Sequence, residues 1–264
     1  MENPSTGKKI AKLISRVYYS FAAVILFLTV WELAARFEIG LNPLFMPPMT
    51  KIFGTLIKFA ITGELWKHLF TSLRRSLIGY CCGISFAIPL GLAIGWFKRF
   101  GNFLNPLLNT FRNIPTLALL PVFVMLFGIT ETAKVAVIFW GVLWSVLLNT
   151  IAGVRDVDSQ LIRAARSMGT SSLRLFVTVV LPGSLPHIFT GMRISATTSI
   201  LILIAAEMLG ASKGLGYAVY FYQANMKFAE MYSYIVVLAL LGIALNVLLN
   251  YIEKRSFLWR DESG

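Results

Sequence analysis

Three stretches of this chain run for 20 residues or more without a charged residue, at 76–97, 135–154 and 231–252. An α-helix rises about 1.5 Å per residue, so roughly 20 apolar residues cross the hydrocarbon core of a bilayer. Three further apolar stretches carry one or two charges inside, at 17–35 with Glu32, 102–128 with Arg112, and 187–208 with Arg193 and Glu207. The pattern predicts an all-α, polytopic membrane protein with about six transmembrane helices.

The composition agrees with a membrane protein and changes the meaning of the net charge. Hydrophobic residues make up 57% of the chain, charged residues 14%, and the mean hydropathy is +0.73. A net charge of +12 would favour a nucleic-acid partner in a soluble protein, but here most Lys and Arg residues lie between apolar runs. The charge therefore indicates topology, and we expect the lipid bilayer as a partner and no nucleic acid.

The distribution of Lys and Arg predicts that both termini lie in the cytoplasm. In that orientation the cytoplasmic segments contain 13 basic residues and the outer segments contain nine. Cytoplasmic loops of membrane proteins carry the excess of Lys and Arg. Segments 43–67 and 210–227 are then expected on the outer side.

The first outer segment has a break and two expected helices. Pro43, Pro47 and Pro48 forbid a regular helix at that point, and a short helix is expected over 51–62. Apolar side chains at helical spacing then predict a separate interfacial helix that contains Trp66, Leu69, Phe70 and Leu73.

Residues that carry catalytic chemistry are scarce. Cys81 and Cys82 are adjacent, so they cannot form a disulfide framework. The two histidines, His68 and His187, are too far apart in sequence to suggest a metal-ligand cluster. The Gly-rich segment 210–216 lacks the order of a phosphate-binding loop. We expect no catalytic residue, no metal site and no cofactor in this chain, and therefore no enzyme.

The segment between the fourth and fifth apolar stretches begins with the pattern of a short amphipathic helix. Asp158 or Ser159 can cap this helix, and Gly169 suits the position after its end. Arg163 and Arg166 lie off the apolar face. That face carries Leu161, Ala164, Ala165 and Met168.

A second helical stretch is expected directly after the first. The run 170–172 can cap a helix over 173–181, which Pro182 interrupts. The small alanines of the first helix would let another protein's backbone come close, so the segment has the form of a docking element. An interfacial helix that lies on the bilayer is the alternative.

The sequence of this segment resembles the signature of a known protein family. Arg163-Ala164-Ala165, three residues, Gly169, nine residues and Val179-Val180-Leu181-Pro182 are similar to the signature Glu-Ala-Ala-x3-Gly-x9-Ile-x-Leu-Pro. That signature belongs to permease subunits of ATP-binding cassette (ABC) importers. The spacing matches in full, and the chain departs from the signature at Arg163, where Glu is frequent, and at Val179, where the family has Ile.

Further segments resemble the branch that imports aliphatic sulfonates, taurine, nitrate and bicarbonate. They are 63–66 (GELW), 112–118 (RNIPTLA), 127–129 (FGI), 181–186 (LPGSLP) and 206–211 (AEMLGA). The resemblance implies one transmembrane permease domain over 1–264 of the type I importer fold, with 155–182 as its cytoplasmic coupling loop. It also implies a bacterial inner-membrane location, a second copy of the chain, and a dimer of ATPase subunits that bind ATP and Mg. A periplasmic or lipid-anchored solute-binding protein completes the expected set of partners.

Two sets of candidate site residues follow. The resemblance assigns coupling to the ATPase to Arg163, Ala164, Ala165, Met168, Gly169, Leu181 and Pro182. Charged or helix-breaking residues inside apolar stretches pair or line water, so they are candidates for the translocation pathway. These are Arg112, Asn113, Pro115, Thr116, Arg193 and Glu207. A structural pair of Arg193 with Glu207 is the alternative for those two residues.

The predicted function is a permease subunit that carries a small anion of the sulfonate, taurine, nitrate or bicarbonate class. The basic residues Arg112 and Arg193 inside apolar stretches agree with an anion. A secondary transporter or channel for a small solute is the alternative, although it would need inverted repeats and no docking segment.

Overall fold

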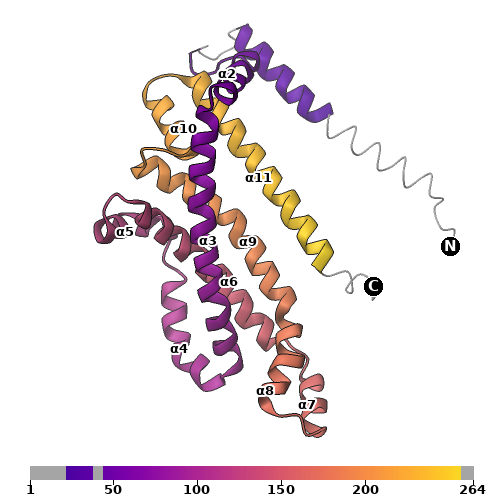
Figure 1. Cartoon of the computed structure of the whole chain (residues 1–264). Helices are drawn as coiled ribbons and strands as arrows, with labels where there is room; N and C mark the ends of the chain where they lie inside the picture. Colours follow the sequence, from indigo (N-terminus) through magenta and orange to yellow (C-terminus); the bar gives the residue numbers. More distant parts are fainter. Residues whose placement is uncertain (1–21, 38–43, 257–264) are drawn as a thin grey trace, which may run out of the picture. The chain divides into compact units, whose positions relative to one another are not determined.

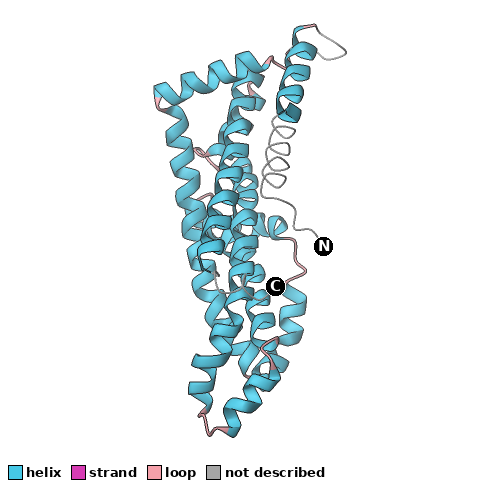
Figure 2. Ribbon diagram, turned by 90° about the vertical axis from the view of Figure 1, so that its right-hand side faces the viewer, coloured by secondary structure: helices cyan, strands magenta, loops and turns pink. Residues whose placement is uncertain are grey.

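The computed structural model describes residues 22–37 and 44–256, with side chains to residue 252. Every regular element in this part of the chain is helical (Figure 2), which confirms the predicted all-α class. In chain order the elements are a helix over 22–36, α2 (Met49–Thr62), α3 (Glu64–Trp96), α4 (Lys98–Phe111), the 3₁₀ helix η1 (Thr116–Leu119), α5 (Leu120–Phe127), α6 (Glu131–Arg155), α7 (Ser159–Ser167), α8 (Ser172–Leu175), the π-helical turn η2 (Phe176–Val180), α9 (Leu181–Gly210), α10 (Leu215–Ala224) and α11 (Phe228–Ser256).

The chain forms two compact units. Met1–Leu65 with Phe221–Ile235 make the first, and Trp66–Tyr220 with Val236–Gly264 make the second. In the first unit the Glu32 carboxylate accepts hydrogen bonds from the Thr50 backbone N–H at 3.1 Å and from the Thr50 hydroxyl at 3.0 Å. Glu32 thereby satisfies an amide of the first turn of α2 that has no partner within its own helix.

The core of the second unit is built around α6, which runs beside α3 and α9 (Figure 1). The contact between α3 and α6 is close because glycines of α3 face it. A Cβ added at Gly83 would lie 2.7 Å from Val142 Cγ1, and one added at Gly91 would lie 2.7 Å from Thr150 Cβ. Small residues of this kind let helices approach each other inside a membrane, where the hydrophobic effect does not drive them together.

Four helical stretches are long and apolar enough to cross a membrane within the described residues: Glu64–Trp96, Glu131–Arg155, Ser172–Gly210 and Phe228–Ile252. They include four of the six predicted spans. The first predicted span, 17–35, lies partly outside the described residues, and its remainder belongs to the helix over 22–36.

The predicted third span, 102–128, is not one straight helix. It consists of α4 and the pair η1 and α5, which are bent by 83° at the break between Phe111 and Thr116. Pro115 causes the break, since it has no N–H to continue the helical ladder and disfavours the helical conformation of Ile114. The bend exposes polar groups inside a sequence that is otherwise apolar.

Two smaller predictions are wrong for related reasons. The interfacial helix expected around Trp66 is the first part of α3, because no Gly or Pro separates Glu64 from the apolar run at 76–97. Pro182 does not interrupt a helix; it lies in the first turn of α9, directly after the π-helical turn η2. Helical structure is continuous from Ser172 to Gly210, because the wider π-helical turn, in which the Leu181 N–H donates to Phe176 O, directly precedes Pro182.

Replacing Gly91 by Ala tests the contact between α3 and α6. The added Cβ has Thr150 and the backbone oxygen of Leu147 within 3.1 Å, so the variant should lose about 1–3 kcal/mol of stability. The measurement is the midpoint of thermal unfolding in detergent. The matched control is Gly242→Ala in α11, where an added Cβ meets nothing within 4 Å and should be neutral or slightly stabilising. Equal midpoints for the two variants would contradict the packing argument.

Candidate functional site

The predicted coupling segment folds as its cap residues predict. The Asp158 carboxylate accepts a hydrogen bond from the Gln160 N–H at 2.7 Å, so Asp158 and not Ser159 caps α7. Gly169 follows the last turn with φ at +77°, a conformation that favours glycine. Its N–H donates to Arg166 O at 2.9 Å, and the Thr170 N–H donates to Ala165 O at 3.1 Å. This double hydrogen bond closes the helix and turns the chain sharply toward α8.

The apolar side chains of α7 are divided between the interior and the outer surface. Ala165 is buried, whereas Ala164 and Arg163 are exposed. The Arg163 guanidinium donates to the Ser159 hydroxyl at 3.0 Å within the same helix. Leu161 and Met168 are 57% and 77% exposed, which is unusual for large apolar side chains. The segment therefore presents an apolar outer surface that the described chain does not cover.

The remaining two predicted coupling residues lie where the segment joins α9. Leu181 is half-buried and Pro182 is exposed in the first turn of α9. The loop helix α7 and the spanning helix α9 are thus connected through α8 and η2 without an irregular stretch after Ser171.

Four of the predicted pathway residues lie together at the bend between α4 and η1. Arg112 is the exposed C-cap of α4, and the Asn113 side-chain amide donates to Asn109 O at 2.6 Å. Pro115 precedes η1, and the half-buried Thr116 is its first residue. The bend brings a cation, an amide and a hydroxyl into one short stretch of a broken span.

The predicted pair of Arg193 with Glu207 is wrong. The two residues are 14 positions apart on one helix, α9, so they are roughly 21 Å apart along its axis. Arg193 is half-buried, whereas Glu207 is fully buried and pairs with Arg75 of α3, with Nη1 and Oε1 2.7 Å apart. The structure therefore separates these two candidates and gives Glu207 a different cation.

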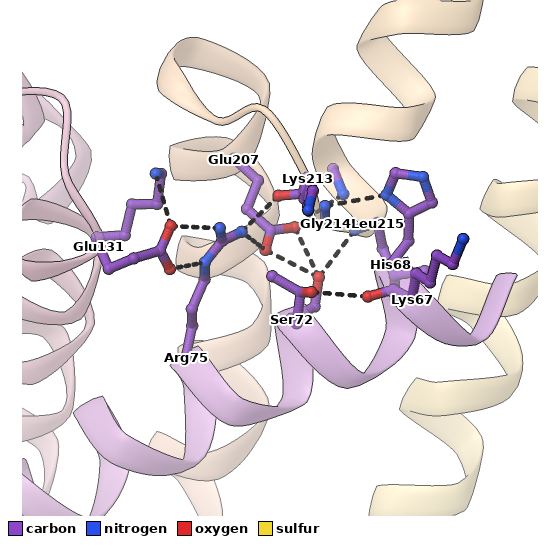
Figure 3. A network of polar contacts seen from close by, with 12 residues as sticks. Lys67, His68, Ser72, Arg75, Glu131, Glu207, Lys213, Gly214 and Leu215 are labelled. Atoms are coloured by element: carbon purple, nitrogen blue, oxygen red, sulfur yellow. Dashed lines mark hydrogen bonds and ion pairs between the residues drawn. The ribbon is translucent and has the colours of Figure 1, made fainter. Parts of the chain in front are cut away.

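Glu207 lies at the centre of a polar network that joins α3, α9 and the loop before α10 (Figure 3). Besides Arg75, its carboxylate accepts hydrogen bonds from the Ser72 hydroxyl at 2.8 Å and from the Gly216 N–H at 3.0 Å. A buried carboxylate is stable only when it is paired and its oxygens are hydrogen-bonded, and these three donors meet both conditions.

Arg75 extends the network on its other side. Its guanidinium forms a bidentate pair with Glu131 at the start of α6, with Nη2 and Oε1 2.6 Å apart, and Nη1 also donates to Lys213 O at 2.6 Å. The Lys134 ammonium lies 3.4 Å from Glu131. Two carboxylates thus balance two cations, which leaves the network neutral.

The network also fixes the loop that follows α9. Lys213 O accepts from Arg75, the Gly214 N–H donates to His68 Nδ1 at 3.0 Å, and the Leu215 N–H donates to Ser72 Oγ at 2.8 Å. Successive backbone groups of this loop are therefore held by side chains of α3 (Figure 3). Within the described residues, no group of His, Cys, Asp and Glu is arranged to hold a metal ion.

Sequence reasoning missed most members of this network, among them Ser72, Arg75 and Glu131. A partial signal was available, since Ser72 and Arg75 are three residues apart and so share a helix face directly before an uncharged run. Their partner could not be identified without the fold, because Glu207 lies more than 130 residues later in the chain.

The chain is similar to known membrane transport proteins over most of its length. The sequence model of the family described as binding-protein-dependent transport system inner membrane component matches residues 86–257. The taurine transport system permease protein TauC of Escherichia coli (strain K12) is 33% identical over 255 residues, which cover 95% of this chain and 92% of that protein. The nitrate import permease protein NrtB of Leptolyngbya laminosa is 32% identical over 193 residues, 73% of this chain and 69% of that protein.

A solved structure has the same fold. The inward-facing MetNI methionine ABC transporter contains a chain that superposes with a TM-score of 0.63 at 20% sequence identity. The superposition covers 71% of this chain and 94% of that chain. The predicted importer permease fold is confirmed by this likeness.

The variant Arg75→Gln tests the network, because it leaves Glu207 buried without a cation. The loss of one partner of a buried ion pair costs about 3–5 kcal/mol, so the yield of folded protein should fall sharply. The double variant Arg75→Gln with Glu207→Gln should recover part of that yield, since it leaves no uncompensated buried carboxylate. Arg74→Gln, at the exposed neighbouring position, is the control and should fold normally.

The yield is measured as the monodisperse fraction in size-exclusion chromatography after extraction in detergent. A double variant that folds no better than Arg75→Gln would show that the two side chains do not stabilise each other.

Proposed function

Because this chain belongs to the family of binding-protein-dependent transport system inner membrane components, we propose that it pairs with a second copy of itself to form the transmembrane pathway of an importer for a small anion. The chain is a multi-pass membrane permease subunit of an ABC importer, and ATP hydrolysis belongs to a separate subunit. The family implies an ATPase partner and a solute-binding protein.

The observation that carries the anion assignment is the position of Arg112. This guanidinium is exposed at the bend of a broken span, beside Asn113 and Thr116. A charge at the centre of a membrane costs roughly 2.5–3.5 kcal/mol for insertion, unless it faces a water-filled cavity or other protein. In a pathway for an anion, water hydrates the Arg112 guanidinium and the negative charge of the solute attracts it. Arg112, Asn113, Pro115 and Thr116 therefore form the solute-facing bend. Arg193 adds a second cation on α9.

The names of similar proteins narrow the solute class. One relative is named for taurine, which is a sulfonate, and another for nitrate. A sulfonate group and nitrate are both small oxyanions that a guanidinium can bind with two parallel hydrogen bonds. The solute of this chain is therefore an anion of the sulfonate, taurine, nitrate or bicarbonate class.

The segment 155–182 couples the permease to the ATPase. This assignment is supported by the exposed apolar side chains of Leu161 and Met168, which lie on and directly after a capped helix. The small Ala164 on the same surface allows a close approach, and Gly169 sets the turn toward α8. The double hydrogen bond at Gly169 makes the segment a rigid body that can pass a displacement to α9 through Leu181 and Pro182.

The same assignment orients the chain. A segment that binds a cytoplasmic ATPase lies in the cytoplasm, and the excess of Lys and Arg on that side agrees with it. Both termini are then cytoplasmic and the loop before α10 is external. A secondary transporter or channel binds no ATPase subunit, so it would not need an exposed docking helix.

Uptake into proteoliposomes tests the function and the role of Arg112. The permease is reconstituted with its ATPase and its solute-binding protein, and ATP-dependent uptake of labelled taurine, nitrate and bicarbonate is compared with that of a neutral amino acid. We expect uptake of one of these three solutes and none of the neutral amino acid. Hydrogen bonds to a charged group are worth about 1.5–3 kcal/mol, so Arg112→Gln should lower uptake about 10-fold or more. Its ATPase subunit should remain bound.

The control variant is Arg99→Gln, which removes an exposed cation near the start of α4 and should transport normally. Normal uptake by a well-folded Arg112→Gln variant would remove Arg112 from the pathway, and uptake of the neutral amino acid alone would reject an anion importer.

The variant Met168→Glu tests the coupling segment. The side chain is mostly exposed, so the permease should fold and insert, but the new carboxylate would be buried without a partner in the docked complex. We expect at least a 10-fold weaker affinity for the ATPase subunit, measured by pull-down titration in detergent. Gln160→Glu adds the same charge at an exposed polar position of α7 and should bind nearly as wild type does. If Met168→Glu and Gln160→Glu bind the ATPase subunit with equal affinity, the docking surface lies elsewhere.

A further inference from the structure

An apolar groove lies at the end of α3 that is joined to α4. It has a volume of about 490 Å³. One wall consists of Leu92, Ala93 and Trp96 of α3, and the other contains Leu173 of α8 and Phe176 of η2. The rings of Trp96 and Phe176 are 5.3 Å apart, and Leu173 is 76% exposed. The groove is therefore an open apolar surface between a membrane span and the coupling segment.

A second, larger cavity adjoins the groove and is basic. It has a volume of about 820 Å³ and shares Trp96, Phe97 and Ser172 with the groove as lining residues. Its cations come from α4, from the end of α6 and from α7, namely Lys98, Arg155, Arg163 and Arg166. No acidic residue of the described part of the chain lines it. One continuous depression thus changes from apolar to strongly cationic along its length.

The four cations are not neutralised by the described part of the chain. No ion pair involves any of them there, and Arg163 donates only to the neutral Ser159 hydroxyl. The two nearest acids in sequence form no ion pair with any of the four. Asp158 caps α7, and Asp156 lies 3.8 Å from His187. Like charges held around one cavity repel each other, so an anion bound between them is favoured.

The position of the depression relative to the bilayer follows from α3. This helix is a membrane span that ends at Trp96, and Lys98 and Arg99 follow directly. Trp residues are enriched at the level of lipid headgroups, and Lys and Arg lie just beyond it on the cytoplasmic side. The apolar groove is therefore at the depth of acyl chains, and the basic cavity is at the depth of lipid phosphates.

We propose that this depression binds one anionic phospholipid, with an acyl chain in the groove along Leu92, Ala93 and Leu173 and the phosphate among Lys98, Arg155 and Arg166. Cationic pockets between helices on the cytoplasmic side are suited to anionic headgroups. A soluble anion would use the basic cavity and leave the apolar groove empty, whereas a phospholipid fills both. The bound lipid would join α3 and α6 to α7, so the position of the coupling segment would depend on the anionic lipid content of the membrane.

The test uses the full-length permease alone in detergent, without ATPase or solute, so its outcome is independent of the proposed transport function. Binding of phosphatidylglycerol, phosphatidylcholine and inorganic phosphate is titrated by native mass spectrometry. We expect wild type to bind phosphatidylglycerol at least 10-fold more tightly than either of the others. The double variant Lys98→Gln with Arg155→Gln should lose that preference, and Ala93→Trp, which fills the groove, should weaken binding of phosphatidylglycerol by a similar factor.

Arg99→Gln is the matched control, because Arg99 is exposed beside Lys98 but does not line the cavity, and it should bind as wild type does. The thermal midpoint of each variant shows that it is folded, and Ala93→Trp and the charge variant test the two halves of the depression separately. Equal affinities for the two lipids would overturn the proposal. Phosphate binding as tight as phosphatidylglycerol would also overturn it. So would unchanged lipid binding in variants that instead lose affinity for the ATPase, since the cavity would then receive an acidic segment of that subunit.

Discussion

The ion pair between Arg75 and Glu207 is the interaction on which the second unit of this protein depends. A buried carboxylate on α9 would oppose insertion and folding, and it becomes acceptable only because α3 supplies a cation and a hydroxyl to the same point. Since Arg75 also holds Glu131, three helices are fixed relative to one another at this level. The loop before α10 is fixed as well, because its carbonyl and N–H groups complete the same network.

A second constraint acts over the length of α3 and α6. Glycines on α3 allow the two helices to approach closely, so side chains of α6 lie directly against the backbone of α3. Polar groups gather instead where the chain departs from regular α-helix, at the bend near Arg112 and in the loop before α10. Non-helical backbone within a membrane span is tolerated where it is buried in protein or lines a water-filled cavity.

The sequence alone predicted the fold class and most spans, because an uncharged apolar run of about 20 residues matches the thickness of the bilayer's hydrocarbon core. It also predicted both ends of α7, since Asp158 and Gly169 act on backbone groups within a few residues. It could not pair Glu207 correctly, because the choice between Arg75 and Arg193 depends on which helix lies opposite. Two local predictions from the sequence were also wrong. A helix boundary was expected at Pro182 and a separate helix around Trp66, but helical structure is continuous at both places.

The unbroken helical stretch from Ser172 to Gly210 has a mechanical consequence. At about 1.5 Å per residue its 39 residues have a length of almost 60 Å along the helix, with the predicted coupling segment at one end and the Glu207 network near the other. When a helix tilts about a point near its middle, its two ends move in opposite directions. A tilt of about 5° would move each end by roughly 2–3 Å, close to the length of a hydrogen bond. A small displacement at the Ser172 end is therefore large enough to alter hydrogen bonds of the Glu207 network near the other end.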